Sequence, residues 1–563
     1  MDYLLATQQY INEMIRLAGP GMKVMLMDKD TTSIISCAHA QSEMMQKEVY
    51  LFERIDSGAV REPIQFLKCV VFVRPTPENV QLLHEELRSP RYVQYYIYFS
   101  NIISKADIKR LAEADEHETV REVQEFYADM IPMAPHLCTL GDPLCYETAF
   151  NMSPRLFRRA LQGLGSVFLS LRKKPMIKFQ RSSRDAQRLG EEMMRLMVRE
   201  EALFDNCTES ATLLILERSE DPVSPLLNQW TYEAMVHELI GITNNRVLMQ
   251  LEGDDAPKNL VLSSQHDEFY AKNKYLNFGD IGQNIKSLMD DYQKKAQTHQ
   301  KLESISDMKR FVEQYPQFRK ISGTITKHVQ VVGELSRLVA AENLLEISEL
   351  EQNIVSSGDY SQNLELMKKL LTDPKTSELN ALRLVMLYSL RYETTTNSLN
   401  SLIDKLKSRG VSSRHIAAIR TLIDYAGSKR RQNDLFGDQS AMEMTKRFIK
   451  GLKGVENVYT QHEPHVSRLI ELLIRDRLPE QLYTTVEATR QTGRVENVIV
   501  FIIGGCTFEE SAAVHAMNQK RLTTTHPRVL LCSNYIHNTK SFVEQLVSLN
   551  SSGYSASTRL ANA

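Results

Sequence analysis

The sequence predicts a mixed fold class, in which two α/β domains with parallel sheets are combined with a large all-α domain inserted into the second of them. Three observations support this prediction. Strand-like apolar runs alternate with amphipathic helical patterns from residue 1 to 224. Between 225 and 478, apolar residues recur at helical spacing with few convincing strands. After 479 the strand–turn–helix pattern returns.

The first α/β domain is expected to span residues 1–132. A helix over Tyr3–Ala18 is ended by Gly19-Pro20-Gly21, and strands follow at "KVMLMD", "VYLFERI", "CVVFV" and "YVQYYIYF". Between the last two strands, Thr76 suits the N-cap of a helix and Pro77 its first turn. Strands that alternate with helices predict a mostly parallel sheet that is covered by helices.

The second α/β domain is expected to be discontinuous, with residues 133–224 and 479–563 flanking the helical domain, residues 225–478. The first piece holds a long helix over 183–204 and the strand "TLLILER". The second piece holds the strands of "VENVIVFIIGG" and "PRVLLCSNY", then a polar tail that we expect to be irregular. Two strands alone cannot bury both faces, so these are predicted to complete the sheet that begins before Pro225.

The composition excludes several classes of protein. The 563 residues carry a net charge of −2, which offers no general attraction to nucleic acid or to an anionic membrane. No apolar run reaches the roughly 18–20 residues that span a bilayer, and the N-terminus is no signal peptide. The seven cysteines form no C-x-x-C pair. We therefore expect a cytoplasmic protein without a zinc module or disulfide framework.

An enzyme remains one alternative. In "LLILERSEDPVSPLLNQWTYEAMVHELIGI", Glu217 and Asp221 follow a strand at the edge where α/β sheets bind ligands. The same residues also suit a structural turn, with Ser224 capping a helix that begins at Pro225. His237 lies among apolar residues, as a packing histidine does. The structural role is favoured.

Cys506 is a second catalytic candidate, in a hydrolase or a nucleotide-binding enzyme. It follows Gly504-Gly505 at a strand end, but no G-x-[SC]-x-G motif surrounds it. The glycines are better explained by a tight turn from strand to helix. No phosphate loop is present, and "HEPH" is better explained as a loop than as a metal site. We expect no catalytic residue, cofactor or metal.

Two segments suit partner binding better. Ile108 and Leu111 share a helix face, and Val120 and Val123 lie on the next element; they form either core or a surface groove. In Met308–Val339, apolar residues follow the spacing of a seam for another helix. We expect Pro316 to bend the chain or to end a helix there, so that the seam helix follows it.

Two stretches resemble a known family. "LLILERSEDPVSPLL" resembles the hallmark of the SM (Sec/Munc) family, which chaperones SNARE assembly in membrane fusion; Glu217 stands where that family usually has Asp. "VIVFIIGGCTFEE" resembles its second signature. The resemblance covers essentially the whole chain. "NQWTYEAMVHELIGI" is most similar to the vacuolar-protein-sorting branch, which serves the trans-Golgi network and endosomes.

The resemblance implies a three-domain arch without catalysis. A syntaxin-like Qa-SNARE would place an N-terminal peptide in an outer groove of the first domain and its helical part in a central cavity. The groove would lie near Ile103, Ile108, Leu111, Val120 and Val123. The junction between the second α/β domain and the helical domain would be formed by Glu217, Arg218, Asp221, Pro222 and Pro225.

The resemblance also implies that a hairpin at about 300–345 templates SNARE assembly. Pro316 would be its hinge, and the vesicle R-SNARE would bind near Pro316, Phe318, Ile321, Ile325 and Val329. The expected partners are a Qa-SNARE, an R-SNARE and the assembled SNARE complex, with no nucleic acid. A monomer is expected that reaches Golgi and endosomal membranes only through SNAREs. A passive helical adaptor is the other alternative.

Overall fold

The computed structural model describes residues 2–58, 61–146, 150–250, 256–300, 305–356, 359–394, 396–432, 435–436, 462–487, 495–521 and 527–560. The chain divides into two compact units. The first comprises residues 1–218, 469–506 and 514–536, and the second comprises residues 219–468, 507–513 and 537–563.

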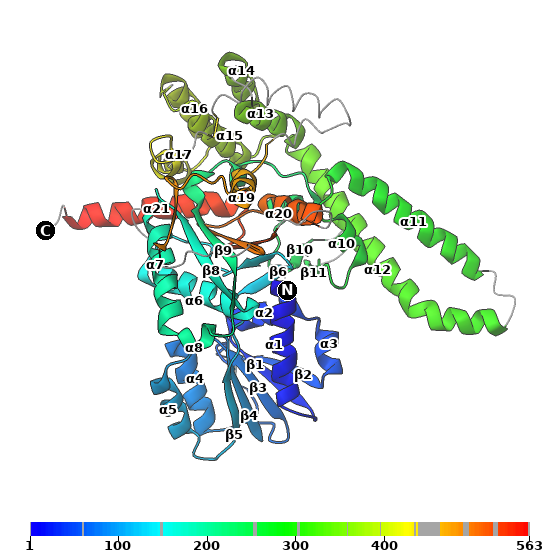
Figure 1. Cartoon of the computed structure of the whole chain (residues 1–563). Coiled ribbons are helices and arrows are strands. Elements are labelled where there is room, and N and C mark those ends of the chain that lie inside the picture. Colours follow the sequence, from blue (N-terminus) through cyan, green and yellow to red (C-terminus); the bar gives the residue numbers. More distant parts are fainter. Residues whose placement is uncertain are drawn as a thin grey trace. The chain divides into compact units, whose positions relative to one another are not determined.

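The first unit begins with a five-stranded parallel sheet in the order β2-β1-β3-β4-β5. The strands are β1 (Lys23–Met27), β2 (Val49–Arg54), β3 (Lys68–Val73), β4 (Gln94–Phe99) and β5 (Val120–Glu125). One face is covered by α1 (Tyr3–Leu17), α2 (Lys29–Ala38) and α3 (Gln41–Gln46), and the other by α4 (Pro77–Arg88) and α5 (Lys105–Ala114) (Figure 1).

The local sequence explains these elements. Val24 and Leu26 pack on the face covered by α4, whereas Met25 and Met27 pack on the opposite face, as the period of a strand requires. Both faces of the sheet are covered, so the inner strands β1 and β3 are apolar after their first residue, whereas the edge strand β5 keeps polar side chains. The Thr76 side chain accepts the Asn79 N–H at the start of α4, which confirms the predicted cap.

The second sheet has seven strands in the order β12-β8-β9-β13-β14-β7-β6. They are β6 (Ile131–Ala134), β7 (Leu137–Thr139), β8 (Lys173–Gln180), β9 (Thr208–Glu217), β12 (Tyr483–Thr485), β13 (Asn497–Ile503) and β14 (Arg528–Ser533). β13 pairs in parallel with both β9 and β14. This confirms that the C-terminal strands complete the sheet that begins before Pro225.

Three helices of the first unit lie between the strands of this sheet in the sequence: α6 (Pro154–Leu171), α7 (Arg184–Arg199) and α8 (Glu201–Phe204). The residues of α20 (Phe508–Arg521), which follows β13, are divided between the two units. The single helix expected over 183–204 is wrong in one detail, because Glu200 interrupts it between α7 and α8. At the end of β13, Gly504 and Gly505 have φ of 92° and 94°. These left-handed conformations explain why the turn from strand to helix uses glycines.

The second unit is mainly helical. It contains α9 (Tyr232–Leu239), α10 (Glu268–Asn273), α11 (Phe278–Gln300), α12 (Ile305–Ala341), α13 (Leu344–Ser356), α14 (Tyr360–Leu370), α15 (Glu378–Arg391), α16 (Thr396–Ser408), α17 (Ser413–Ala426) and α21 (Thr539–Leu560). The residues of α19 (His465–Ile474) are divided between the two units. The unit also contains a two-stranded antiparallel sheet, formed by β10 (Arg246–Met249) and β11 (Lys258–Val261).

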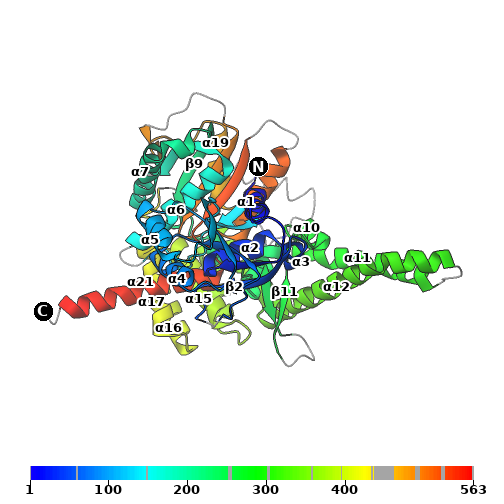
Figure 2. The same ribbon diagram turned by 90° about the horizontal axis from the view of Figure 1, so that it is seen from below.

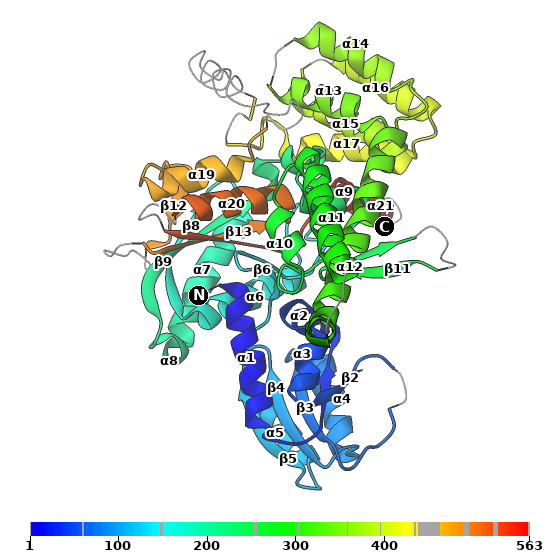
Figure 3. The same cartoon turned by 90° about the vertical axis from the view of Figure 1, so that its right-hand side faces the viewer.

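Helices α11 and α12 run side by side as a long hairpin that extends beyond the other helices of its unit (Figure 1, Figure 2 and Figure 3). The expectation that the seam helix begins after Pro316 is wrong, because α12 passes through this residue. A proline removes one backbone hydrogen bond without ending a helix when the turns on both sides continue. Figure 1 shows the α12 ribbon changing direction toward its N-terminal end.

The predicted fold class is confirmed in its large helical part and in its two α/β parts, whose sheets are parallel except for the antiparallel edge strands β12 and β6 of the second sheet. The precise domain bounds stay a prediction. The tail expected to be irregular is helical as far as Leu560, within α21. The helix expected at Pro225 is a short 3-10 turn over Ser224–Leu226, because the chain is already extended at Leu227.

Candidate partner-binding surfaces

The described part of α12 has a buried side and an exposed apolar side. His328, Val331 and Leu335 are buried, whereas 41% of Val329 is exposed. Ile321 and Ile325 are half-buried at the four-residue spacing that leads to Val329. The side chains of residues 305–320, which include Pro316 and Phe318, lie outside the described part. The predicted templating residues therefore include one clearly exposed side chain, Val329.

A buried hydrogen-bonded cluster fixes the rotation of α12. His328 Nδ1 lies 2.8 Å from the Tyr232 hydroxyl of α9, and His328 Nε2 lies 2.8 Å from Asp267 Oδ2 at the N-cap of α10. Lys327 also pairs with Asp267. The next residue, Val329, is turned by about 100° from His328 around the helix, and its side chain is exposed.

The charge of Asp267 is part of this cluster. Burial acts to raise the Asp267 pKa, but the His328 and Lys327 interactions outweigh burial and hold that pKa well below its ordinary value. The carboxylate also accepts the Tyr270 N–H at 2.9 Å. Asp267 is therefore ionised at neutral pH and can bind α12 to the start of α10.

The edge of the first sheet offers a second apolar surface. Val123 of the edge strand β5 is in register with Ile97, whose side chain belongs to the core beneath α4 and α5. Val123 therefore lies on the sheet face that α5 covers, and 42% of it is exposed. On α5 itself, 39% of Ile108 is exposed.

The other predicted groove residues are less accessible. Ile103 and Leu111 are 6% and 5% exposed and belong to the core between the sheet and its helices, and Val120 packs against that core. Only Ile108 and Val123 of the predicted set offer substantial apolar surface to a partner. Of the five predicted residues, two lie on α5, two on β5 and one, Ile103, in the loop before α5.

The acidic residues Glu220 and Asp221 of the hallmark stretch accept hydrogen bonds that stabilise the turns of the chain around them. Asp221 accepts hydrogen bonds from the backbone N–H of Val223 and Ser224, from the Ser224 hydroxyl at 2.6 Å, and from the His465 N–H. Glu220 accepts the Gln432 N–H. The chain leaves the first unit after Arg218, within the predicted junction. These contacts favour the structural role over the enzymatic alternative.

Glu217 and Arg218 belong to the first unit. The Tyr146 hydroxyl donates to Glu217 Oε1 at 3.1 Å, and Arg218 Nη1 donates to the Gly505 carbonyl at 3.5 Å. The Arg218 contact ties the hallmark stretch to the second signature stretch. Cys506 beside it is fully buried, and its sulfur accepts the Ser533 hydroxyl at 3.1 Å. A buried thiol in this position is poorly accessible to a substrate.

His237 and Glu238 have structural partners. His237 Nδ1 accepts the Ile242 N–H, and its ring packs edge-on against Phe508. Glu238 pairs with Arg383 at 3.1 Å. Arg383 also pairs at 3.1 Å with Glu351, a fully buried residue of α13. This charged cluster joins α9, α13 and α15.

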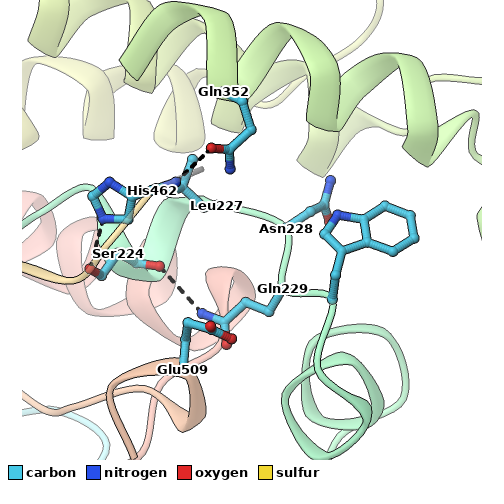
Figure 4. Close-up of a pocket in the computed structure, with 8 residues that line it drawn as sticks. Ser224, Leu227, Asn228, Gln229, Gln352, His462 and Glu509 are labelled. Atoms are coloured by element: carbon cyan, nitrogen blue, oxygen red, sulfur yellow. Dashed lines mark hydrogen bonds between the residues drawn. The ribbon is translucent and has the colours of Figure 1, made fainter. Parts of the chain in front are cut away.

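A small cavity lies beside this cluster (Figure 4). Its volume of about 30 Å³ suits one or two water molecules rather than a substrate. Ser224 and His462 line it, with Ser224 Oγ 3.3 Å from His462 Nε2 (Figure 4). The shorter hydrogen bond of Ser224 goes to Asp221, so this serine is not arranged as a nucleophile whose proton passes to histidine.

The described residues lack two further features. They contain no group of three or more His, Cys, Asp or Glu side chains that could hold a metal ion. None of their helices combines the length and the apolar character that crossing a membrane requires.

The model of the Sec1 family matches residues 23–545. The chain belongs to the Sec1 family. A mouse (Mus musculus) member, vacuolar protein sorting-associated protein 45, is 52% identical over 97% of this chain and 96% of its own. The Saccharomyces cerevisiae protein of that name is 35% identical over 93% of this chain and 94% of its own. The family and branch expected from the hallmark stretches are thereby confirmed.

A solved structure of a Sec1-family relative gives the same result for the fold. The SM protein Vps45 in complex with the Qa SNARE Tlg2 matches with a TM-score of 0.89 and 41% identity. The match covers 98% of this chain and 99% of that chain. This chain therefore has the fold of that relative over nearly its whole length.

The sequence pattern did not reveal the buried charged cluster. Arg383 lies in the run "ALRLVMLYSL", and a single arginine in such an apolar helix was a usable signal of a buried ion pair. Its partners Glu238 and Glu351 come from distant positions in the chain. The role of His328 in anchoring α12 was missed for the same reason.

Proposed function

We propose that this protein binds a syntaxin-like Qa-SNARE and promotes SNARE assembly for vesicle fusion in trans-Golgi and endosomal traffic. One observation carries the proposal: the close match, over nearly the whole chain, to a relative solved in complex with the Qa SNARE Tlg2. The relatives named for vacuolar protein sorting support the trafficking route.

The N-terminal peptide of the Qa-SNARE is proposed to bind the α5–β5 surface. Ile108 and Val123 supply exposed apolar area, while Ile103, Leu111 and Val120 support them from the core. Fully burying one aliphatic side chain contributes roughly 1.5–3 kcal/mol, so these two partly exposed anchors would supply a fraction of that each to the binding of a short apolar peptide motif.

Calorimetric titration with a trans-Golgi or endosomal Qa-SNARE cytoplasmic region tests the function. Stoichiometric binding is expected, and removal of the N-terminal peptide should weaken it. Binding that ignores the peptide would move the Qa-SNARE contact away from the α5–β5 surface. No binding to any syntaxin-like Qa-SNARE would refute the proposed function.

The substitution Ile108→Arg tests the groove. A charged side chain replaces the apolar anchor, so affinity for the isolated N-terminal peptide should fall at least tenfold, which corresponds to about 1.4 kcal/mol. The matched control is Val198→Arg on α7, where another exposed aliphatic side chain is replaced far from this surface in the sequence. Wild-type affinity in the Ile108 variant would rule out this groove.

The α11–α12 hairpin is proposed to receive the R-SNARE. The apolar side of α12 near Val329 suits a second amphipathic helix, and Pro316 is the proposed hinge of the hairpin. By holding two unstructured SNARE segments on one scaffold, the protein would lower the entropic cost of aligning them. The assembled SNARE complex is a further proposed partner.

Binding rather than chemical turnover is proposed as the whole activity. The Asp221 carboxylate is occupied by loop N–H groups, and Cys506 is buried. The protein is proposed to act as a monomer in the cytoplasm and to reach Golgi and endosomal membranes through its SNARE partners.

A further inference from the structure

One segment of the chain is strongly basic. Between Asn151 and Arg188 the sequence contains ten lysines or arginines and a single acidic residue, Asp185. In the whole chain, by contrast, 68 basic residues are balanced by 70 acidic ones. The segment covers α6, β8 and the first turns of α7. Its charge is therefore a local feature that the net charge of the protein conceals.

Five of these arginines lie at the starts of two packed helices. Arg155 and Arg158 are in the first turns of α6, and Arg181, Arg184 and Arg188 precede or begin α7. We call these five residues the arginine surface.

The two helix starts are held together by specific contacts. The Met152 N–H, just before α6, donates to Asp185 Oδ2 at 2.6 Å, and the Arg188 guanidinium lies 4.4 Å from the centre of the Phe157 ring. Helices α6 and α7 lie next to each other in Figure 1 and Figure 2. The arginines of both helices therefore belong to one region of the surface.

The helix periodicity places Arg158 beside α7. Gly165 of α6 lies against the Leu196 side chain of α7. Arg158 precedes Gly165 by seven residues, which is about two helical turns, so it lies on the same side of α6.

The charges of the arginine surface are exposed and largely uncompensated. All five arginines are exposed. Within the described residues, Arg155, Arg158 and Arg184 form no salt bridge, and Arg188 has only a 3.6 Å contact with Asp185. Asp185 is itself buried and accepts the Met152 N–H. Arg155 attracts the Asp142 carboxylate and Arg184 attracts that of Asp185, but neither arginine is held in a salt bridge within the described residues, so both guanidinium groups are available to an anionic partner.

We propose that the arginine surface binds the phosphate groups of an anionic membrane directly, in addition to any contact made through SNAREs. Guanidinium groups bind phosphate oxygens in a bidentate manner. The arginines are spread over two helix starts rather than gathered around one pocket, which suits the many phosphates of a lipid surface better than a single phosphorylated side chain. Clusters of four to eight basic residues bind anionic lipids in this way.

Co-sedimentation with lipid vesicles tests the proposal without any SNARE. The probes are phosphatidylcholine vesicles, alone or with phosphatidylserine or a phosphatidylinositol phosphate. The wild-type protein should bind the anionic vesicles only, and salt should weaken the binding. Each basic residue near such a surface contributes about fivefold in partitioning, so Arg155→Gln/Arg158→Gln/Arg184→Gln should reduce it on the order of a hundredfold.

The matched control removes the same number of charges elsewhere in the first unit. Arg16→Gln/Arg195→Gln/Arg199→Gln replaces three exposed arginines and should keep wild-type binding. Circular dichroism checks that both triple variants are folded. If both triple variants lost vesicle binding to the same extent, net charge alone would explain the binding, and the proposal would be overturned.

Two other results would also overturn it. One is a wild-type protein that binds no anionic vesicle. The other is a wild-type protein that ignores vesicles but binds a multiply phosphorylated peptide through the same arginines, which would assign the surface to a protein partner.

Discussion

At the scale of single residues, Glu351 is the most unusual group of the helical unit. It is fully buried, pairs with Arg383 and accepts the backbone N–H of Asn228 at 2.8 Å. Burial raises the Glu351 pKa to about 7, although the attraction of Arg383 opposes this rise. A carboxyl group with this pKa makes the stability of the unit depend on pH near neutrality.

The sign of that dependence follows from proton linkage. The Glu351 pKa lies near its ordinary value of 4.5 in the unfolded chain and near 7 in the folded chain. Between these values the folded chain binds the additional proton, so the stability contributed by this group is lost as pH rises through the window. Relative to Glu351→Gln, the wild type should lose about 3 kcal/mol of unfolding free energy from pH 4.5 to 7.5.

Trp230 is a suitable probe for this measurement. It is the only tryptophan of the protein, and its indole N–H donates to Ser348 Oγ on the helix that carries Glu351. Urea unfolding should be followed by its fluorescence at several pH values. Glu349→Gln, an exposed position on the same helix, is the control and should show the pH profile of the wild type. Parallel profiles for all three proteins would contradict the prediction.

At the scale of elements, α12 has two distinct sides. His328 binds one side of it to α9 and α10, and Val329, about 100° further around the helix, leaves an apolar group exposed. The anchor holds the helix in one rotation, so a partner helix would meet a preformed apolar side. Preformed surfaces bind more tightly because less conformational entropy is lost on association.

Val329→Asp tests this side of α12. A charge in place of the apolar contact should weaken the binding of an R-SNARE peptide at least tenfold, while binding of the Qa-SNARE N-terminal peptide stays unchanged. The measurement is a titration of each peptide. Leu345→Asp replaces another exposed aliphatic side chain, on α13, and should leave both affinities as they are. A Val329 variant that binds the R-SNARE peptide normally would remove α12 as its site.

At the scale of the whole molecule, the chain forms two compact units. Chains with several domains often depart from two-state unfolding. We therefore expect the Trp230 fluorescence transition, which reports the second unit, to differ in midpoint from the far-UV circular dichroism transition, which reports both. At pH 7.5, Glu351→Gln should shift the midpoint of the fluorescence transition. The part of the circular dichroism transition that reports the first unit should keep its wild-type midpoint. Coincident transitions in both proteins would show that the units unfold together.

Much of the fold could be predicted from local patterns. Alternating strands and helices gave the parallel sheets, and the isolated pair of C-terminal strands had to join an existing sheet, as the β13 pairings confirm. The errors occurred where local patterns compete. Pro316 lies inside α12, and Glu200 interrupts the helix that was expected to reach residue 204. Propensities are small energies, and tertiary packing overrides them.

The candidate site was less predictable than the fold. Apolar spacing identified Ile108, Leu111, Val120 and Val123 but could not distinguish core from surface. That distinction depends on which neighbouring element covers each side chain. Only the placement of α5 over the sheet shows that Leu111 is buried and Ile108 is exposed.

Local sequence patterns were enough to predict the fold class, the order of the elements and, through the hallmark stretches, the family. These properties depend on local periodicity and on short motifs, which are contiguous in the chain. Tertiary structure alone decided which groups meet: the Glu351–Arg383 pair, the His328 anchor and the arginine surface each join residues from different elements. Burial and pairing of charges depend on these distant neighbours, so no local pattern contains them.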